Sequence, residues 1–138
     1  MTRLRSRFVL LIPLLLLLTP PRSASAHHSF AAEYDASKPV TLRGTVTKVD
    51  WVNPHAWLHL DVKGADGGIV AWMVELGTPN VLMRRGFTKK SLEPGAELVV
   101  QGYLAKNGEN KANGGTVTFA DGTKLFVGGS APNEIPQK

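Results

Sequence analysis

The sequence predicts a small all-β domain with one short helix. Segments that alternate apolar and polar residues recur along the chain, and β-branched residues are frequent in them. A single segment carries the start and stop signals of a helix. A two-residue turn signal, Asp121-Gly122, divides the last alternating stretch and predicts a hairpin.

Three strands are expected in the first half of the chain. Residues 40–49 alternate and are rich in valine and threonine, and Gly44 within them suggests a bulge or a sharp bend. Residues 55–62 place alanine, leucine and valine on one face and histidine, tryptophan and aspartate on the other. In residues 69–76, the alternation places one set of apolar residues on one face of the strand and Met73 and Glu75 on the opposite face.

The second half begins with the helix. Thr78 is a candidate N-cap, Pro79 suits the first helical position, and Gly86 suits the residue after the end. A fourth strand is expected over residues 97–105.

The polar, glycine-rich residues 107–115 are expected to form a loop, and residues 116–127 the hairpin. Three strands, a helix and further strands are the element order of an OB-like Greek-key barrel of five to six strands, whose helix lies between strands 3 and 4. A β-sandwich is the alternative.

The N-terminus predicts export. Residues 1–7 are basic, residues 8–18 are apolar, and the run ends too early to span a bilayer. Ala24-Ser25-Ala26 suits signal peptidase. We therefore expect a signal peptide over residues 1–26, one domain over residues 27–128, a flexible tail over residues 129–138, and a periplasmic or secreted protein with no membrane span after cleavage.

Charge and cysteine content exclude several classes of function. Of the 16 basic residues, four lie in the signal peptide (Arg3, Arg5, Arg7 and Arg22), which leaves 16 − 4 = 12 against 11 acidic residues. The mature chain is nearly neutral, which argues against a nucleic-acid partner. The chain has no cysteine, so disulfides and thiolate metal sites are excluded. No hydrolase motif is present either.

Two histidines directly follow the predicted cleavage site. The free amine and imidazole of His27 can chelate one metal ion, and His28 offers a further imidazole. Nitrogen ligands of this kind suit copper, then nickel and zinc. The alternative is a solvated, unstructured chain end.

A second histidine cluster lies at the start of the second strand. His55 and His59 are about 13 Å apart along a strand, so one ion cannot ordinarily bind both. We favour His55, which follows the Asn53-Pro54 turn signal, and interpret His59 as a solvated bystander. Glu75 completes the site or orients a histidine, unless it is an exposed edge residue; His55 itself has the alternative of a structural turn histidine.

Tryptophans offer a different kind of site. Trp51 and Trp57 could form a stacking face for a glycan or an envelope protein partner, whereas Trp72 lies on the apolar face and suits the core. The basic pairs Arg84-Arg85 and Lys89-Lys90 are explained by the preference of cations for helix C-termini.

The combination His27-His28-Ser29-Phe30, Gly44-Thr45-Val46, Asn53-Pro54-His55, Trp72…Glu75 and Leu92-x-Pro94-Gly95 resembles the bacterial exported family catalogued as domain of unknown function 6152. The resemblance implies a small exported β domain and marks His27, His28, His55 and Glu75 as motif positions, without naming an activity. The terminal histidine with a second histidine is also similar to the copper "histidine brace" of some periplasmic copper carriers and oxidative polysaccharide-cleaving enzymes.

Two hypotheses follow. The first is a periplasmic copper-binding module with metal ligands His27, His28, His55 and Glu75, serving metal handling rather than catalysis. The second is an OB-type ligand- or partner-binding domain in envelope stress tolerance, which uses the Trp51 and Trp57 face and no metal. An oxidative copper enzyme is a weaker third.

Overall fold

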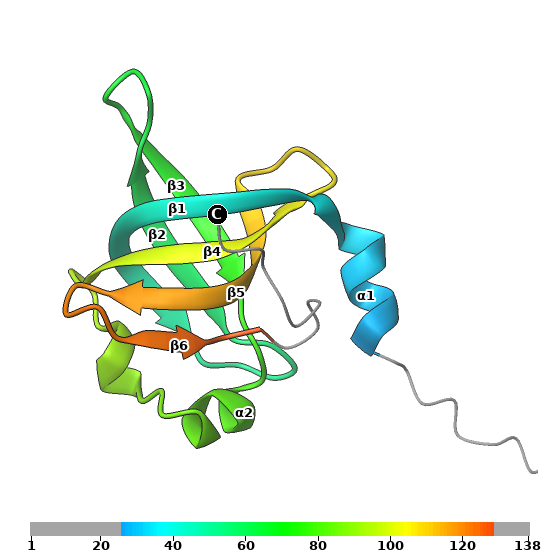
Figure 1. Cartoon of the computed structure of the whole chain (residues 1–138), viewed down its shortest axis with the longest axis vertical. Helices are drawn as coiled ribbons and strands as arrows, with labels where there is room; N and C mark the ends of the chain where they lie inside the picture. The colour runs from blue at the N-terminus through cyan, green and yellow to red at the C-terminus, as the bar shows by residue number, and fades with distance from the viewer. Residues whose placement is uncertain (1–25, 129–138) are drawn as a thin grey trace, which may run out of the picture.

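The structure is a computed structural model that describes residues 26–128 (Figure 1). The predicted signal peptide, apart from Ala26, and the predicted tail over residues 129–138 lie outside the described residues. Within the described part, no helix has the length and apolar character needed to cross a membrane.

Six strands and three short helices make up the described chain. In order they are α1 (Ala26–Glu33), β1 (Tyr34–Asp50), β2 (Trp57–Lys63), β3 (Ile69–Glu75), α2 (Pro79–Arg84), the 3-10 helix η1 (Lys89–Leu92), β4 (Glu97–Ala105), β5 (Lys111–Phe119) and β6 (Lys124–Phe126). The predicted β-rich architecture is confirmed.

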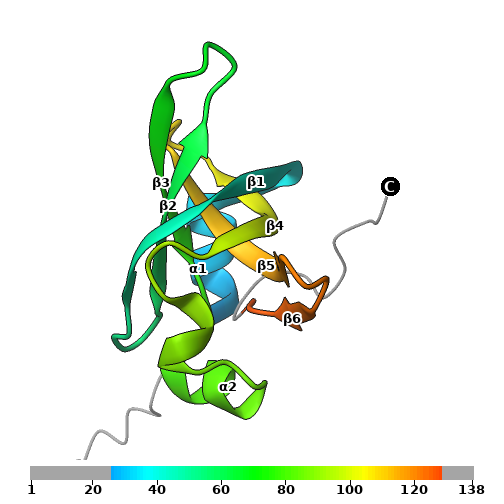
Figure 2. The ribbon, with the colours of Figure 1, turned by 90° about the vertical axis from the view of Figure 1, so that its left-hand side faces the viewer.

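All six strands belong to one sheet in the order β3-β2-β1-β4-β5-β6, with antiparallel neighbours. One further pairing joins β3 to β5 in parallel, through Met73 to Lys111, Val74 to Ala112 and Glu75 to Asn113. The sheet therefore curls until two strands that are not neighbours in its main order meet (Figure 2).

The predicted helix forms where its signals place it, between the third and fourth strands. The Thr78 hydroxyl accepts a hydrogen bond from the amide of Val81, and Pro79 opens α2. Gly86 ends it with φ of 95°, a left-handed conformation that glycine adopts without a steric penalty. Both views show α2 and the projecting β2–β3 hairpin at opposite ends of the sheet (Figures 1 and 2).

The prediction of a loop over residues 107–115 is wrong for its second half, because β5 begins at Lys111. Glycine there permits close packing instead of a turn. A Cβ atom on Gly102 in β4 would lie 2.2 Å from the carbonyl oxygen of Asn113, and one on Gly114 would lie 2.9 Å from Val74. Small residues thus let β3, β4 and β5 approach one another.

The region before residue 40 and the role of Gly44 also differ from expectation. The chain start forms α1, and β1 begins at Tyr34. The register of β1 shifts between Val46 and Lys48 against β2 and between Tyr34 and Pro39 against β4, whereas Gly44 pairs on both sides, with Val62 and Leu98. A Cβ on Gly44 would lie 2.6 Å from a backbone oxygen of β2, so this glycine also serves close approach.

Two clusters of buried side chains hold the fold. The main core contains the inward residues of all strands except β6, together with residues from α2 and the segments around η1, Leu82, Phe87 and Leu92 among them. The second cluster is Phe30, Tyr34, Tyr103 and Ala105, which we call the aromatic cluster. It attaches α1 to the start of β1 and the end of β4, in a different part of the molecule from α2 (Figure 1).

Substituting Gly102 with alanine tests the close packing. Because the new methyl group would overlap the Asn113 carbonyl, the strands must move apart, and we expect a loss of about 1–3 kcal/mol in the free energy of unfolding. The urea midpoint measures it, with an unchanged m-value. Gln101→Ala, at the neighbouring half-buried position, is the control and should cost less than about 1 kcal/mol. Equal midpoints for the two variants would contradict the packing argument.

Candidate functional site

His55 lies in the segment between β1 and β2, and the backbone fixes it beside the end of β3. The segment contains a cis peptide bond between Asn53 and Pro54. The amide of Ala56 donates to the carbonyl of Gly77 (3.1 Å), and the amide of Leu76 donates to the carbonyl of Ala56 (2.9 Å). These two bonds continue the β2–β3 pairing past Glu75 and set the position of the imidazole.

The imidazole of His55 pairs with the Glu75 carboxylate, through Nδ1 and Oε1. Glu75 is buried, and the His55 side chain is 19% exposed. The carboxylate thus occupies one ring nitrogen and fixes the ring orientation, which leaves Nε2 as the atom able to bind a ligand. The structure therefore brings together two of the four predicted metal residues, and Glu75 is not an exposed edge residue.

Glu75 lies in a row of residues that crosses the sheet. Its partner in β2 is Trp57, and its partner in β5 is Asn113. Asn113 is 3% exposed, and its side-chain oxygen has no hydrogen-bond partner among the described residues. The row continues to Tyr103 in β4. Polar groups are thus buried on this side of the sheet next to the carboxylate.

Tyr34 places a phenol against the same carboxylate. Its side chain is buried, and burial raises the pKa of the Tyr34 phenol well above its ordinary value; the neighbouring carboxylates of Glu75 and Glu33 raise it further. The hydroxyl has no well-aligned hydrogen bond in the described part of the chain. It therefore approaches Glu75 as a neutral group in a poorly solvated environment.

The aromatic cluster fixes α1 next to this environment. The ring of Phe30 stacks on Tyr34 and meets Tyr103 edge-on, each with ring centroids 5.7 Å apart. The Lys106 ammonium donates to the Ala31 carbonyl (2.6 Å), near the C-terminal end of α1, where a cation is favourable. The Lys111 ammonium pairs with Glu33 (3.3 Å). The helix that contains His27 and His28 is thus anchored at its C-terminal half.

At the backbone level His27 and His28 lie in α1, three and two residues before Phe30, and their side chains are outside the described part of the structure. Within residues 30–128, no group of three or more histidine, cysteine or acidic side chains could hold a metal ion. The structure thus leaves the joint site of His27 and His55 untested.

His59 has a partner of its own. Its Nε2 atom lies 2.9 Å from a carboxylate oxygen of Asp50, which also pairs with Lys48 (2.9 Å). These two hydrogen bonds, that of Lys48 first, lower the pKa of the Asp50 carboxyl. His59 does not join His55, in agreement with the strand spacing, but it is held in place and is not merely solvated.

The three tryptophans are all partly buried. Trp51 and Trp57 are both half-buried, and Trp51 packs against the main core, as Trp72 does. Arg85 has a structural role: its guanidinium donates to the Gly128 carbonyl (2.6 Å) and lies 4.6 Å from the centre of the Phe126 ring.

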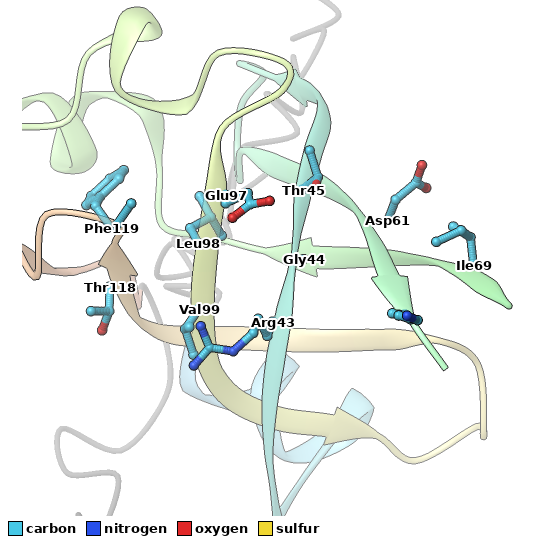
Figure 3. Close-up of a pocket in the computed structure, with 12 residues that line it drawn as sticks. Arg43, Gly44, Thr45, Asp61, Ile69, Glu97, Leu98, Val99, Thr118 and Phe119 are labelled. Atoms are coloured by element: carbon cyan, nitrogen blue, oxygen red, sulfur yellow. The ribbon is translucent and has the colours of Figure 1, made fainter. Parts of the chain in front are cut away.

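A groove of about 510 Å³ is lined by residues of β1 to β5, with Ile69 as the contribution of β3 (Figure 3). Asp61 and Ile69 lie on one side of β1, while Arg43 extends toward Val99 and Thr118 on the other (Figure 3). None of its lining residues belongs to the His55–Glu75 site. The sequence did not indicate this groove, because its residues come from five separate strands.

Tyr34 and Asn113 were also missed. Tyr34 lies before residue 40, where no strand was expected, and Asn113 lies in a segment interpreted as a loop. The one available signal was the aromatic spacing of Phe30 and Tyr34, four residues apart, which is the separation of contacting residues on a helix.

The buried phenol predicts a loss of stability in alkali. Because the pKa of Tyr34 is raised in the folded state, unfolding releases a proton above pH 10, the ordinary pKa of the group. Below that pH the effect is absent; above it the folded state loses up to about 1.4 kcal/mol per pH unit. Urea unfolding from pH 8 to 11.5 measures this slope. The free energy of unfolding of Tyr34→Phe should fall less steeply with pH than that of the unsubstituted protein. An identical slope in the two proteins would contradict a raised pKa at Tyr34.

Comparison with known proteins places the chain in a family. No curated protein matches it, and no solved structure matches it. Residues 16–115, most of the chain, match the model of a family of unknown function, DUF6152. The match includes His27, His28, His55 and Glu75, the motif positions on which the resemblance rests. The chain therefore belongs to the DUF6152 family.

Proposed function

We propose that this protein is an exported copper-binding module that serves metal handling in the periplasm. Its signal peptide ends at Ala26, so that His27 becomes the first residue of the mature chain. The amine and imidazole of His27 and the Nε2 atom of His55 bind the ion, and His28 supplements them. Glu75 does not bind the ion but orients the imidazole of His55 through its Nδ1 atom.

The observation that carries the proposal is the pairing of a partly exposed histidine with a buried carboxylate. Metal-binding histidines usually donate their second ring N–H to a carboxylate or carbonyl, which fixes the tautomer and strengthens the ligand nitrogen. The His55–Glu75 pair has this arrangement. A carboxylate already engaged with the imidazole is better suited to orienting it than to binding the ion directly.

A chain of contacts connects His55 with the N-terminal helix. His55 pairs with Glu75, Glu75 interacts with the Tyr34 hydroxyl, and Tyr34 stacks on Phe30. Phe30 is only three residues from His27, less than one helical turn. This anchoring supports a site shared by His27 and His55, because it restrains the terminal ligands near the third nitrogen before an ion arrives.

The finer description of the fold is part of the proposal. The pairings β1–β2, β2–β3, β3–β5, β5–β4 and β4–β1 connect five strands in a ring, and α2 lies between the third and fourth. This connectivity supports an OB-like Greek-key barrel. The His55 site then lies outside the barrel, where α1 covers the row that contains Glu75.

Copper(II) titration of the mature chain beginning at His27 tests the site. We expect one tight equivalent, weakened at least tenfold, or about 1.4 kcal/mol, by a single additional N-terminal glycine, because the extension moves the amine. His55→Ala should weaken binding to the same extent through loss of a ligand. Glu75→Gln should cost between 10- and 100-fold, as is typical for residues that orient a ligand.

His59→Asn provides the matched control, since it removes a histidine from the same strand face without touching Glu75. The first equivalent of copper should bind this variant as it binds the unsubstituted chain. Equal affinity in the extended, His55→Ala and unsubstituted proteins would refute the proposal.

The groove favours a second function, ligand binding without metal. Its volume lies within the range of small-molecule sites, and its walls combine both signs of charge with Ile69 and Phe119. Titration with trialanine or chitotriose should then shift the amide NMR signals of Thr45 and Val99 and leave that of His55 unchanged. Shifts confined to Trp51 and Trp57, or none, would count against the groove.

A further inference from the structure

His59 in β2 repeats the arrangement of His55, which lies just before the strand. Nε2 of His59 is held by the Asp50 carboxylate at 2.9 Å, and the side chain is 22% exposed. A carboxylate on one ring nitrogen fixes the ring and leaves the other, here Nδ1, as a potential ligand. His59 is thus oriented and partly accessible, and the His55 site does not use it.

A methionine lies directly opposite His59. Met73 in β3 is the antiparallel partner of His59, and its side chain is 41% exposed. Directly opposed residues have Cβ atoms about 4.5–5.5 Å apart, and their side chains leave the sheet on the same face. An imidazole nitrogen and a thioether sulfur are therefore presented side by side.

Both side chains line one hollow, separate from the charged groove. It has a volume of about 450 Å³, and Thr47, Glu109, Asn110 and Lys111 also line it. The neighbouring cations already have partners. Lys111 pairs with Glu33 and lies 5.6 Å from the centre of the Tyr34 ring, and Lys48 pairs with Asp50. These acidic partners offset the positive charge that would otherwise repel a metal ion.

We propose that His59 and Met73 form a second metal site, selective for a soft monovalent ion, copper(I). A thioether is a soft ligand that suits copper(I), and imidazole binds copper as well. The ion binds between Nδ1 of His59 and Sδ of Met73 without any change of oxidation state. The site requires neither the free terminus nor His55, so it goes beyond the copper(II) site and stands independently of it.

Silver(I), a soft ion that does not change oxidation state here, is the probe. The chain from His27 with one added N-terminal glycine contains two methionines, Met73 and Met83. Met83 in α2 is 55% exposed and serves as an internal control. On addition of one equivalent of silver(I), we expect the ¹³C-labelled methyl signal of Met73 to shift and that of Met83 to remain in place.

Competition against a copper(I) chelator then measures affinity. Met73→Leu, a swap of similar volume at an exposed position, should weaken copper(I) binding at least tenfold, and Met83→Leu should leave it unchanged. His59→Asn should match Met73→Leu, with urea midpoints confirming that each variant is folded. Equal methyl shifts at both methionines, or copper(I) affinity unaffected by Met73→Leu, would overturn the site. The blocked terminus separates this outcome from failure of the copper(II) site.

Discussion

The carboxylate of Glu75 is the constraint around which this side of the molecule is arranged. A buried carboxylate without partners costs several kcal/mol, so the chain must supply groups that lower its energy. His55 supplies an imidazole from the segment after β1, and Tyr34 brings a hydroxyl from the start of the same strand. The start of the 17-residue strand β1 and the segment that follows its end therefore converge on one side chain. The strong curl of β1 makes this convergence possible.

Burial of Glu75 depends on backbone atoms coming close together. Its strand pairs with β5 only over three residues, and this short parallel contact needs β4 and β5 close to β3. Gly102 and Gly114 permit that approach, because a Cβ at either would overlap a neighbouring strand. The same region leaves the Asn113 oxygen without a partner beside the carboxylate. Polar groups whose burial destabilises the folded state are thus concentrated beside Glu75, the residue that orients His55 in the proposed site.

The sequence predicted the elements whose signals are local. Alternation located β2, β3 and β4 closely, and the cap residues Thr78 and Gly86 located α2. The prediction was wrong where one amino-acid composition is compatible with two different structures. Asn113-Gly114-Gly115 has the composition of a loop, but glycine also allows strands to approach closely, and only the tertiary structure distinguishes the two. Of the site, the His55–Glu75 pair was foreseeable from strand order. Tyr34 was not, because its contact with Glu75 spans 41 positions of chain.

Strand geometry also explains why two histidines so close in sequence have different surroundings. His55 and His59 are four residues apart, about 13 Å along the strand direction, so each needs its own carboxylate and neither can share an ion with the other. His55 lies beside the end of β3, where a buried acid and the N-terminal helix are near, which favours hard or borderline nitrogen coordination. His59 lies in β2 opposite the thioether of Met73, and its Nε2 atom pairs with the carboxylate of Asp50. One period-2 pattern therefore places two histidines beside different partners, and this difference is why we propose copper sites of different oxidation state for them.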